Sequence, residues 1–132
     1  MSKLKVTTIA NVADSESTDV TNVINGSAKA WVNFDGTFGT SPFTVANGGI
    51  RAAFNVSSVT DNGTGNYTVN FTTPMSDTNY SVVASGRGVG GTSFVTHSKE
   101  YVSPTVSAVR IVCVTSTGGG VNSANVDVAI FR

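Results

Sequence analysis

Apolar and polar residues alternate in short runs along the chain, which is the pattern of strands that bury one face. Residues 28–34 place Ala30, Val32 and Phe34 on one face and leave Trp31 on the other, between polar neighbours. Further strands are predicted at residues 4–9, 50–59, 67–71, 80–85, 93–98, 105–115 and 124–131. Short strands separated by Gly, Ser and Asn turns predict an all-β fold, an antiparallel β-sandwich of jelly-roll or Ig-like type.

The run at residues 50–59 contains one break in this alternation. Ile50 and Val56 share a parity that Val59 does not, which predicts a β-bulge near Ser57–Ser58. The DNGTG turn that follows predicts a hairpin to the next run, because Asn and Gly tolerate positive φ. Four aromatic residues share faces with valines and are expected in the core: Phe34, Phe54, Tyr67 and Phe71.

The chain divides near residue 27. Residues 28–132 carry the main run of predicted strands and form the sandwich domain, whereas residues 1–27 form an extended N-terminal arm and a polar linker. A helical turn is predicted in the linker at Val20, Val23 and Ile24. The arm carries alternating apolar residues at Leu4, Val6 and Ile9. Because an exposed strand readily adds to the edge of another sheet, we expect this arm to pair with another chain and not to join its own core.

Composition agrees with a sheet protein and excludes several classes. The chain has 21 valines and 18 threonines but a single leucine and no glutamine. β-branched residues favour strands, so a helical bundle is ruled out and a doubly wound α/β fold is disfavoured. Eight basic residues balance eight acidic ones, which leaves no electrostatic footprint for nucleic acid or an anionic membrane. Without a signal-peptide core or a bilayer-length apolar run, the chain is expected to be made in a cytoplasm, with no targeting signal visible in the sequence and no membrane insertion.

Few residues offer catalytic or metal chemistry. His97 and Cys113 are the sole histidine and cysteine, which leaves a transition-metal site short of ligands and rules out an internal disulfide. The GRGVGG stretch at residues 86–91 matches a dinucleotide-binding pattern, but a strand pattern follows it where a helix is required. A pair such as Glu100 with Asp61 would act on a glycoside only if the fold brought the two within about 5–10 Å. We therefore expect no enzymatic activity and no cofactor.

Two predicted strands are apolar on both faces, which points to a partner. In residues 105–115, Val109 and Ile111 lie on one face and Val112 and Val114 on the other. A solitary sandwich needs only one apolar face per strand. Zero net charge and only 12% charged residues would leave such a monomer poorly soluble, so an obligate oligomer is predicted.

Trp31 stands out because the rest of its face is polar. It packs against a second chain, stacks on a sugar, or is covered by a loop of its own chain. Trp31, Val112 and Val114 are accordingly the candidates for a subunit interface. Phe38 and Phe43 in the long loop at residues 35–49 share the same three alternatives. Candidate contact residues in exposed loops are Phe38, Phe43 and Arg87.

The stretch KAWVNFDGT at residues 29–37, followed by IRAAFNVSSVTDNGTGNYTVNF at residues 50–71, resembles a module of bacteriophage tail-fibre and other virion-surface proteins. The similarity continues through TTPM at residues 72–75 to YSVV at residues 80–83, and it covers about residues 30–85 strongly. The opening SKLKVTTI also resembles the start of short structural proteins of marine and cyanobacterial phages.

The resemblance implies a homotrimeric, β-rich domain displayed on the phage particle. A tail fibre usually has a long shaft, whereas about 27 residues precede the module here. We therefore expect the protein to sit on another fibre protein or to decorate a surface directly, with residues 1–10 as the virion-anchoring arm. The first alternative is a receptor-binding or fibre-tip protein whose exposed loops contact a host surface glycan. The second is a capsid or tail decoration or cement protein that binds no ligand.

Overall fold

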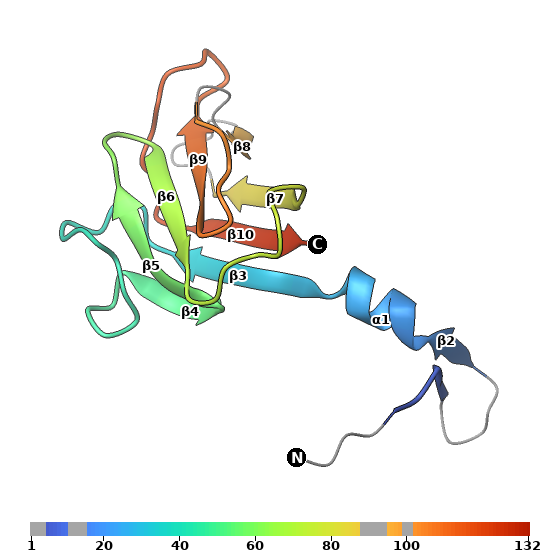
Figure 1. The fold of residues 1–132 in the computed structure, drawn as a ribbon. Helices are drawn as coiled ribbons and strands as arrows, with labels where there is room; N and C mark the ends of the chain where they lie inside the picture. Colours follow the sequence, from blue (N-terminus) through green and yellow to red (C-terminus); the bar gives the residue numbers. More distant parts are fainter. Residues whose placement is uncertain (1–4, 11–15, 88–94, 99–101) are drawn as a thin grey trace.

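Two antiparallel β-sheets pack face to face in this computed structural model, which describes residues 5–10, 16–87, 95–98 and 102–132 (Figure 1). Its elements are β1 (Thr8–Ala10), β2 (Ser17–Asp19), α1 (Val20–Gly26), β3 (Ala28–Phe34), β4 (Ile50–Phe54), β5 (Val56–Asp61), β6 (Asn66–Phe71), β7 (Ser81–Gly86), β8 (Val95–Ser98), β9 (Ala108–Val114) and β10 (Val126–Phe131). The predicted all-β sandwich is confirmed, and the helical turn expected in the linker is α1.

The two sheets have the strand orders β4-β3-β10-β7 and β5-β6-β9-β8, and all paired strands are antiparallel. β3 and β10, the first and last strands of the sandwich, are neighbours in the interior of their sheet. The order in which the strands are connected differs from that of a jelly roll and from that of a constant-type Ig domain. β3 to β6 follow one another around the sandwich, in place of the two Greek keys of a jelly roll or the seven strands of a constant-type Ig domain.

The predicted strand at residues 50–59 is in fact two strands that belong to different sheets. Asn55 separates β4 from β5 with a positive φ of 53°, and this bend carries the chain from one sheet to the other. The register also shifts in β4, where Asn33 pairs with Ala52 but Phe34 pairs with Ile50. A second shift lies between Val56 and Ser58, which confirms the bulge predicted there.

The bulge in β4 overturns one core prediction. An extra residue in a strand changes the side to which later side chains point. Ile50 is therefore buried, whereas Phe54, of the same parity, is 54% exposed on the outside of the sheet. The other three aromatic residues expected in the core, Phe34, Tyr67 and Phe71, are buried.

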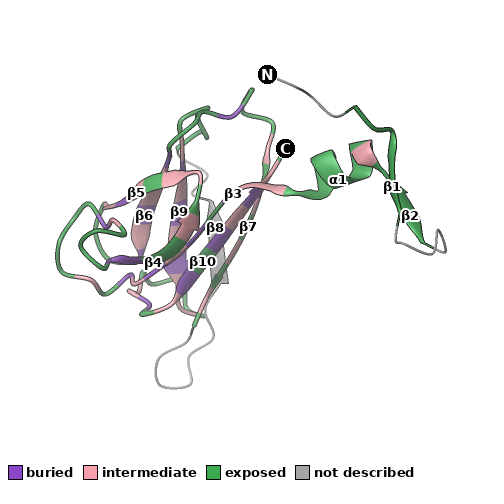
Figure 2. Ribbon diagram, turned by 90° about the horizontal axis from the view of Figure 1, so that it is seen from below, coloured by how far each residue is buried: buried purple, intermediate pink, exposed green. Residues whose placement is uncertain are grey.

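The core lies between the sheets and consists mainly of residues of one parity from β3, β6, β9 and β10 (Figure 2). Ile50 of β4, Val59 of β5 and two residues of connecting segments, Phe43 and Met75, complete it. Tyr67 is fully buried and its ring meets that of Phe34 edge-on, with 5.1 Å between centroids. Phe43 was expected in an exposed contact loop, and this prediction is wrong because its side chain is fully buried. Its backbone forms an isolated bridge with Val59, which draws this part of the loop down onto the core.

The N-terminal elements lie apart from the sandwich. β1 and β2 pair with each other, and α1 continues from β2 and projects beyond the end of β3 (Figures 1 and 2). α1 begins at the cap residue Asp19, whose carboxylate accepts a hydrogen bond from the backbone N–H of Thr21 at 2.7 Å. Among the residues described, no helix combines the length and apolarity that a membrane crossing requires.

Candidate functional site

A row of apolar side chains crosses the outer face of the sheet formed by β4, β3, β10 and β7. The strand register aligns Phe54 with Trp31, Trp31 with Ala129, and Ala129 with Val83. These four residues are called the apolar row. Trp31, Phe54 and Val83 are 40%, 54% and 60% exposed, so the row is open to solvent along its length. Exposed apolar residues that are contiguous across several strands commonly mark a binding surface.

A second row, made of polar side chains, runs beside the first. Asn33, Asp127 and Ser85 are cross-strand neighbours on β3, β10 and β7, each two residues along its strand from a member of the apolar row. These three residues are called the polar row. The side-chain amide of Asn33 donates a hydrogen bond to Oδ1 of Asp127. The face therefore offers an apolar strip and a line of hydrogen-bonding groups side by side.

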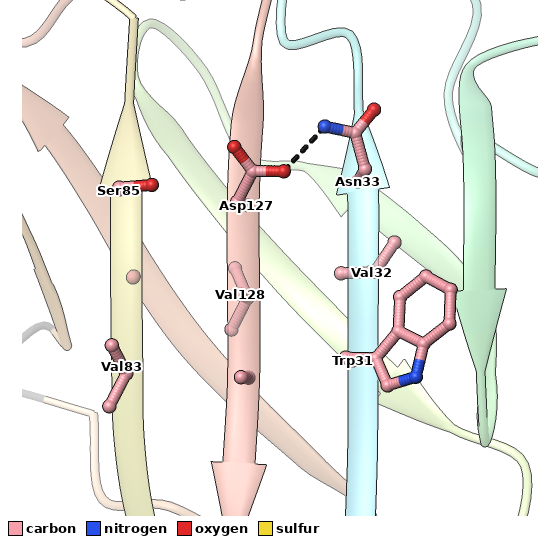
Figure 3. A pocket seen from close by; sticks show the side chains of 9 residues that line it. Trp31, Val32, Asn33, Val83, Ser85, Asp127 and Val128 are labelled. Carbon is pink, nitrogen blue, oxygen red and sulfur yellow. Dashed lines mark hydrogen bonds between the residues drawn. The ribbon is translucent and has the colours of Figure 1, made fainter. Parts of the chain in front are cut away.

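A shallow hollow of about 290 Å³ lies between the two rows (Figure 3). Trp31 and Val83 stand on opposite sides of it, and the small side chain of Ala129 lies between them. Figure 3 looks onto this face and shows the indole ring of Trp31 broadside, so the ring lies flat against the sheet. Asp127 and Ser85 border the hollow on its polar side.

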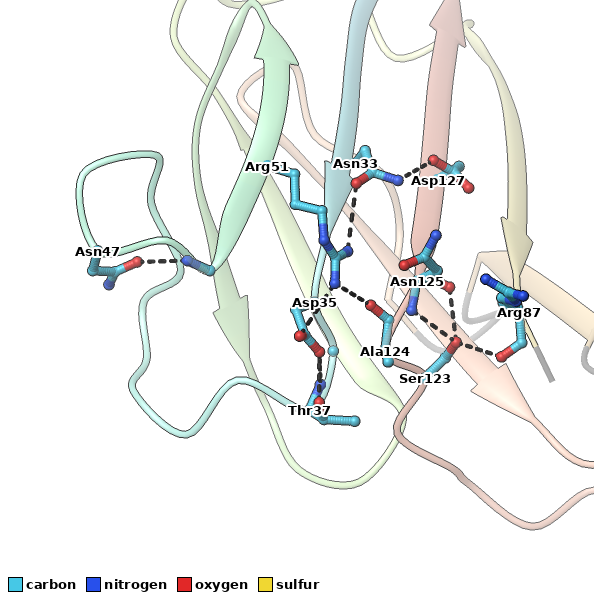
Figure 4. A network of polar contacts seen from close by, with 12 residues as sticks. Asn33, Asp35, Thr37, Asn47, Arg51, Arg87, Ser123, Ala124, Asn125 and Asp127 are labelled. Carbon is cyan, nitrogen blue, oxygen red and sulfur yellow. Dashed lines mark hydrogen bonds and ion pairs between the residues drawn. The ribbon is translucent and has the colours of Figure 1, made fainter. Parts of the chain in front are cut away.

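Arg51 holds the polar row in position (Figure 4). Its guanidinium forms a salt bridge with Asp35 at 3.2 Å and donates to the backbone carbonyl of Ala124 at 2.6 Å. It also donates to Oδ1 of Asn33 at 3.4 Å, and Asn33 in turn donates to Asp127. The orientation of the Asn33 amide is thus set from both ends.

The charge of Arg51 is compensated within this network. Partial burial acts to raise the pKa of Asp35, but hydrogen bonds from Thr37 and the charge of Arg51 outweigh it, and the pKa lies below its ordinary value. Asp35 is therefore ionised at neutral pH and pairs with Arg51. Asp127, by contrast, is exposed and forms no ion pair with the residues that the structure describes.

The other interface candidates lie on the opposite side of the sandwich. Val112 and Val114 are half-buried on the outer face of β9, in the sheet that does not contain Trp31. Arg110 shares that face and needs a partner if it is covered, and its Nε donates to Oδ1 of Asn66 at 2.7 Å. Of the three alternatives for Trp31, a covering loop is excluded within the described residues, because the indole remains exposed.

The remaining predicted site residues are scattered. Phe38 is half-buried, with its ring edge-on to that of Phe43 at a centroid distance of 5.8 Å, whereas Arg87 is exposed at the end of β7. Val6 and Ile9 of the arm are about half exposed. Leu4 lies outside the described residues, as does most of the glycine-rich stretch at residues 88–91.

Sequence patterns found only one member of each row on this face. The alternation in residues 28–34 places Trp31 and Asn33 on the same side, but it does not indicate which strands flank them. Asp127 and Val83 join them only through the pairing of β10 with β3 and β7. Alternation within each strand indicates which of its residues share a face. It does not indicate which strands are neighbours in the sheet, and the site depends on that order.

Neither a metal-binding cluster among the described residues nor a similar known protein indicates what this face binds. Within the described ranges, no three His, Cys, Asp or Glu side chains gather as a metal-binding set. Comparisons with protein-family models, curated sequences and solved structures find no match to the chain.

Proposed function

We propose that this chain is a bacteriophage structural protein displayed on the surface of the virion, as a homotrimeric tail-fibre or fibre-tip protein that takes part in host recognition. The resemblance of residues 30–85 to virion-surface modules supports the phage assignment. The observation that carries the proposal is the division of the chain into an exposed arm and a folded sandwich. A protein displayed on a virion needs one part that attaches it to the particle and one part that faces outward, and we assign these roles to the arm and to the sandwich domain.

The arm has the properties of a segment that is completed by another protein. A two-stranded hairpin and a seven-residue helix are each marginal in isolation. Val6, Ile9 and Ile24 are all exposed, and the contacts of the arm elements are chiefly with one another. Burial of these side chains against a fibre or baseplate protein supplies the missing stabilisation.

The proposed trimer uses the outer face of β9. Val112 and Val114 on that face lie opposite to Trp31, so one ring of three subunits cannot use both faces as its contacts. If the β9 faces meet around the three-fold axis, the face with the apolar and polar rows points outward. The trimer then leaves a surface available for a ligand.

Locating the chain in the virion tests the proposal. Antibody raised against the purified protein should label the tail fibres of intact particles, and particle reconstruction should place the sandwich there in sets of three. Quantitative mass spectrometry should find a small number of copies per particle. A copy number comparable to that of the capsid subunits would identify a decoration protein and contradict the fibre assignment. Absence from purified virions would contradict the whole proposal.

A further inference from the structure

We infer that the apolar and polar rows together form a binding site for a neutral saccharide, with one pyranose ring stacked on Trp31 and its hydroxyl groups on Asn33, Asp127 and Ser85. The inference rests on the proposed function, because it names the ligand class for host recognition. It moves the recognition surface from the loops to the flat outer face of the sheet.

The stacking part follows from the position of Trp31. A pyranose ring presents a patch of C–H groups on one face, and the electron-rich face of indole is the best aromatic partner for such positive edges. The indole lies flat on the sheet with its broad side outward (Figure 3), and it is 40% exposed. Phe54, its cross-strand neighbour, offers a second exposed ring for the next sugar unit.

The polar row lies within reach of the same sugar ring. Residues two apart on a strand are separated by about 7 Å, so hydroxyls at the edge of a stacked ring approach Asn33 and Asp127. Oδ2 of Asp127 accepts no hydrogen bond from the described residues, whereas Oδ1 is held by Asn33. Because Arg51 in turn fixes Asn33, the polar groups are set before a ligand arrives, which lowers the entropy cost of binding.

The charges of the site select against anionic sugars. Asp127 carries a negative charge in the polar row and forms no ion pair with the described residues, and Arg51, which bonds Asn33, is itself paired with Asp35. A sialic or uronic acid would place a carboxylate beside Asp127 and meet repulsion. A hexose or N-acetylhexosamine brings only hydroxyl and amide groups, which Asp127 and Asn33 can bind.

A second copy of the chain fits this face less well. Taking about 200 Å² for a whole aromatic side chain, the exposed parts of Trp31 and Phe54 amount to about 200 Å² together. Two such faces bring together only about 400 Å² of exposed aromatic surface, whereas obligate homodimer interfaces are large and mostly apolar. Such a contact would also bury Asp127 without a cation, which is costly.

Fluorescence of the single tryptophan provides a direct assay. The full-length chain is titrated with neutral oligosaccharides of glucose, galactose and N-acetylglucosamine, with sialyllactose as the anionic comparison. We expect a saturable change in Trp31 emission with at least one neutral series and none with sialyllactose. A glycan array then defines the preferred sugar.

Variants separate the two parts of the site. Calorimetry should show that Trp31→Ala weakens binding by about tenfold or more, since such aromatic anchors dominate binding energy. Trp31→Phe should retain part of the affinity, and Asp127→Asn should relax the discrimination against sialyllactose. Val45→Ala, at an exposed position in the long loop, is the matched control and should bind like the parent chain. All four substitutions are at exposed side chains, so unchanged melting curves verify that the fold is intact.

Two results would overturn the inference. The first is a folded chain with a solvent-exposed tryptophan that binds no neutral saccharide in solution or on the array. The second is a tryptophan already shielded in the free protein, together with a smaller oligomer in Trp31→Ala, which would identify the face as a subunit contact. Neither result bears on where the protein sits in the virion. Conversely, saccharide binding by a chain absent from virions would contradict the proposed function alone.

Discussion

At the scale of single residues, the hydroxyl of Tyr67 ties the core to two connecting segments. It lies 2.7 Å from the carbonyl oxygen of Gly36 and 2.9 Å from Oδ1 of Asn122, and the side chain is fully buried. Tyr67→Phe leaves the carbonyl of Gly36 without its donor among the described residues, whereas Oδ1 of Asn122 still accepts from the N–H of Gly65. The free energy of unfolding should therefore fall by about 1–3 kcal/mol in urea denaturation. Tyr80→Phe is the control and should cost less, because its half-buried hydroxyl is replaced by water. Equal losses in the two variants would contradict this reasoning.

Cys113 makes stability depend on pH. Burial raises the pKa of its thiol to about 11, whereas an exposed cysteine ionises near 8.5. Between these values the unfolded chain loses a proton that the folded chain keeps, so the free energy of unfolding should decrease as pH rises from about 8.5 to 11. Urea denaturation at several pH values should show a shallower decline for Cys113→Ala. Burial also raises the pKa of Tyr67 in both proteins, and the charge of an ionised Cys113 adds to that rise only in the parent chain. Identical pH profiles would contradict the prediction.

At the scale of elements, Asn55 controls the passage from β4 to β5. Its φ of 53° favours Asn or Gly, and its side chain bonds the backbone of Lys29 at 3.0 Å and of Thr73 at 2.7 and 3.1 Å. Asn55→Gly keeps the conformation but loses these bonds, and should cost about 1–3 kcal/mol. Asn55→Ala should cost about 1 kcal/mol more, since alanine is strained at this φ. Asn79→Ala, in an exposed turn, should stay within about 0.5 kcal/mol of the parent.

At the scale of the whole molecule, the proposed homotrimer depends on the outer face of β9. If it forms, size exclusion with light scattering should give three times the chain mass of 13.5 kDa. Val112→Asp with Val114→Asp should dissociate the trimer, because charges on the contact face repel and lose apolar burial. Val83→Asp, on the opposite sheet, should leave the mass unchanged. A folded, soluble monomer of the parent chain at micromolar concentration would contradict the trimer.

The arm and the sandwich should also separate in function. Deletion of residues 1–10 removes β1 and leaves the sandwich contacts intact, so the melting transition followed by circular dichroism should hardly move. The same deletion should abolish incorporation into virions, which immunoblotting of purified particles measures. A deletion that unfolds the sandwich would show that the arm belongs to its core.

The aromatic residues show how far prediction from sequence reached. Alternation placed Phe34 and Tyr67 in the core correctly, because burial alternates without a break from Ala30 to Phe34 and from Tyr67 to Phe71. Phe54 turns outward after the bulge in β4, and Phe43 turns inward from a loop with no periodic pattern. The bulge reverses the direction of Phe54, and the bridge to Val59 brings Phe43 onto the core. Apolar periodicity carries no record of either feature.

The sequence by itself determined the all-β sandwich, the separation of the arm and most of the strands, although not the division of residues 50–59 into β4 and β5. These depend on interactions between residues close in the chain, namely β-branched propensity, alternation and turn residues. Only the tertiary structure decided which strands are neighbours, and the candidate site depends on that choice. Trp31 and Asp127 lie on β3 and β10, nearly a hundred residues apart, and meet because these strands pair. Strand pairing depends on how the entire chain fills one core, so it cannot be read from any one segment.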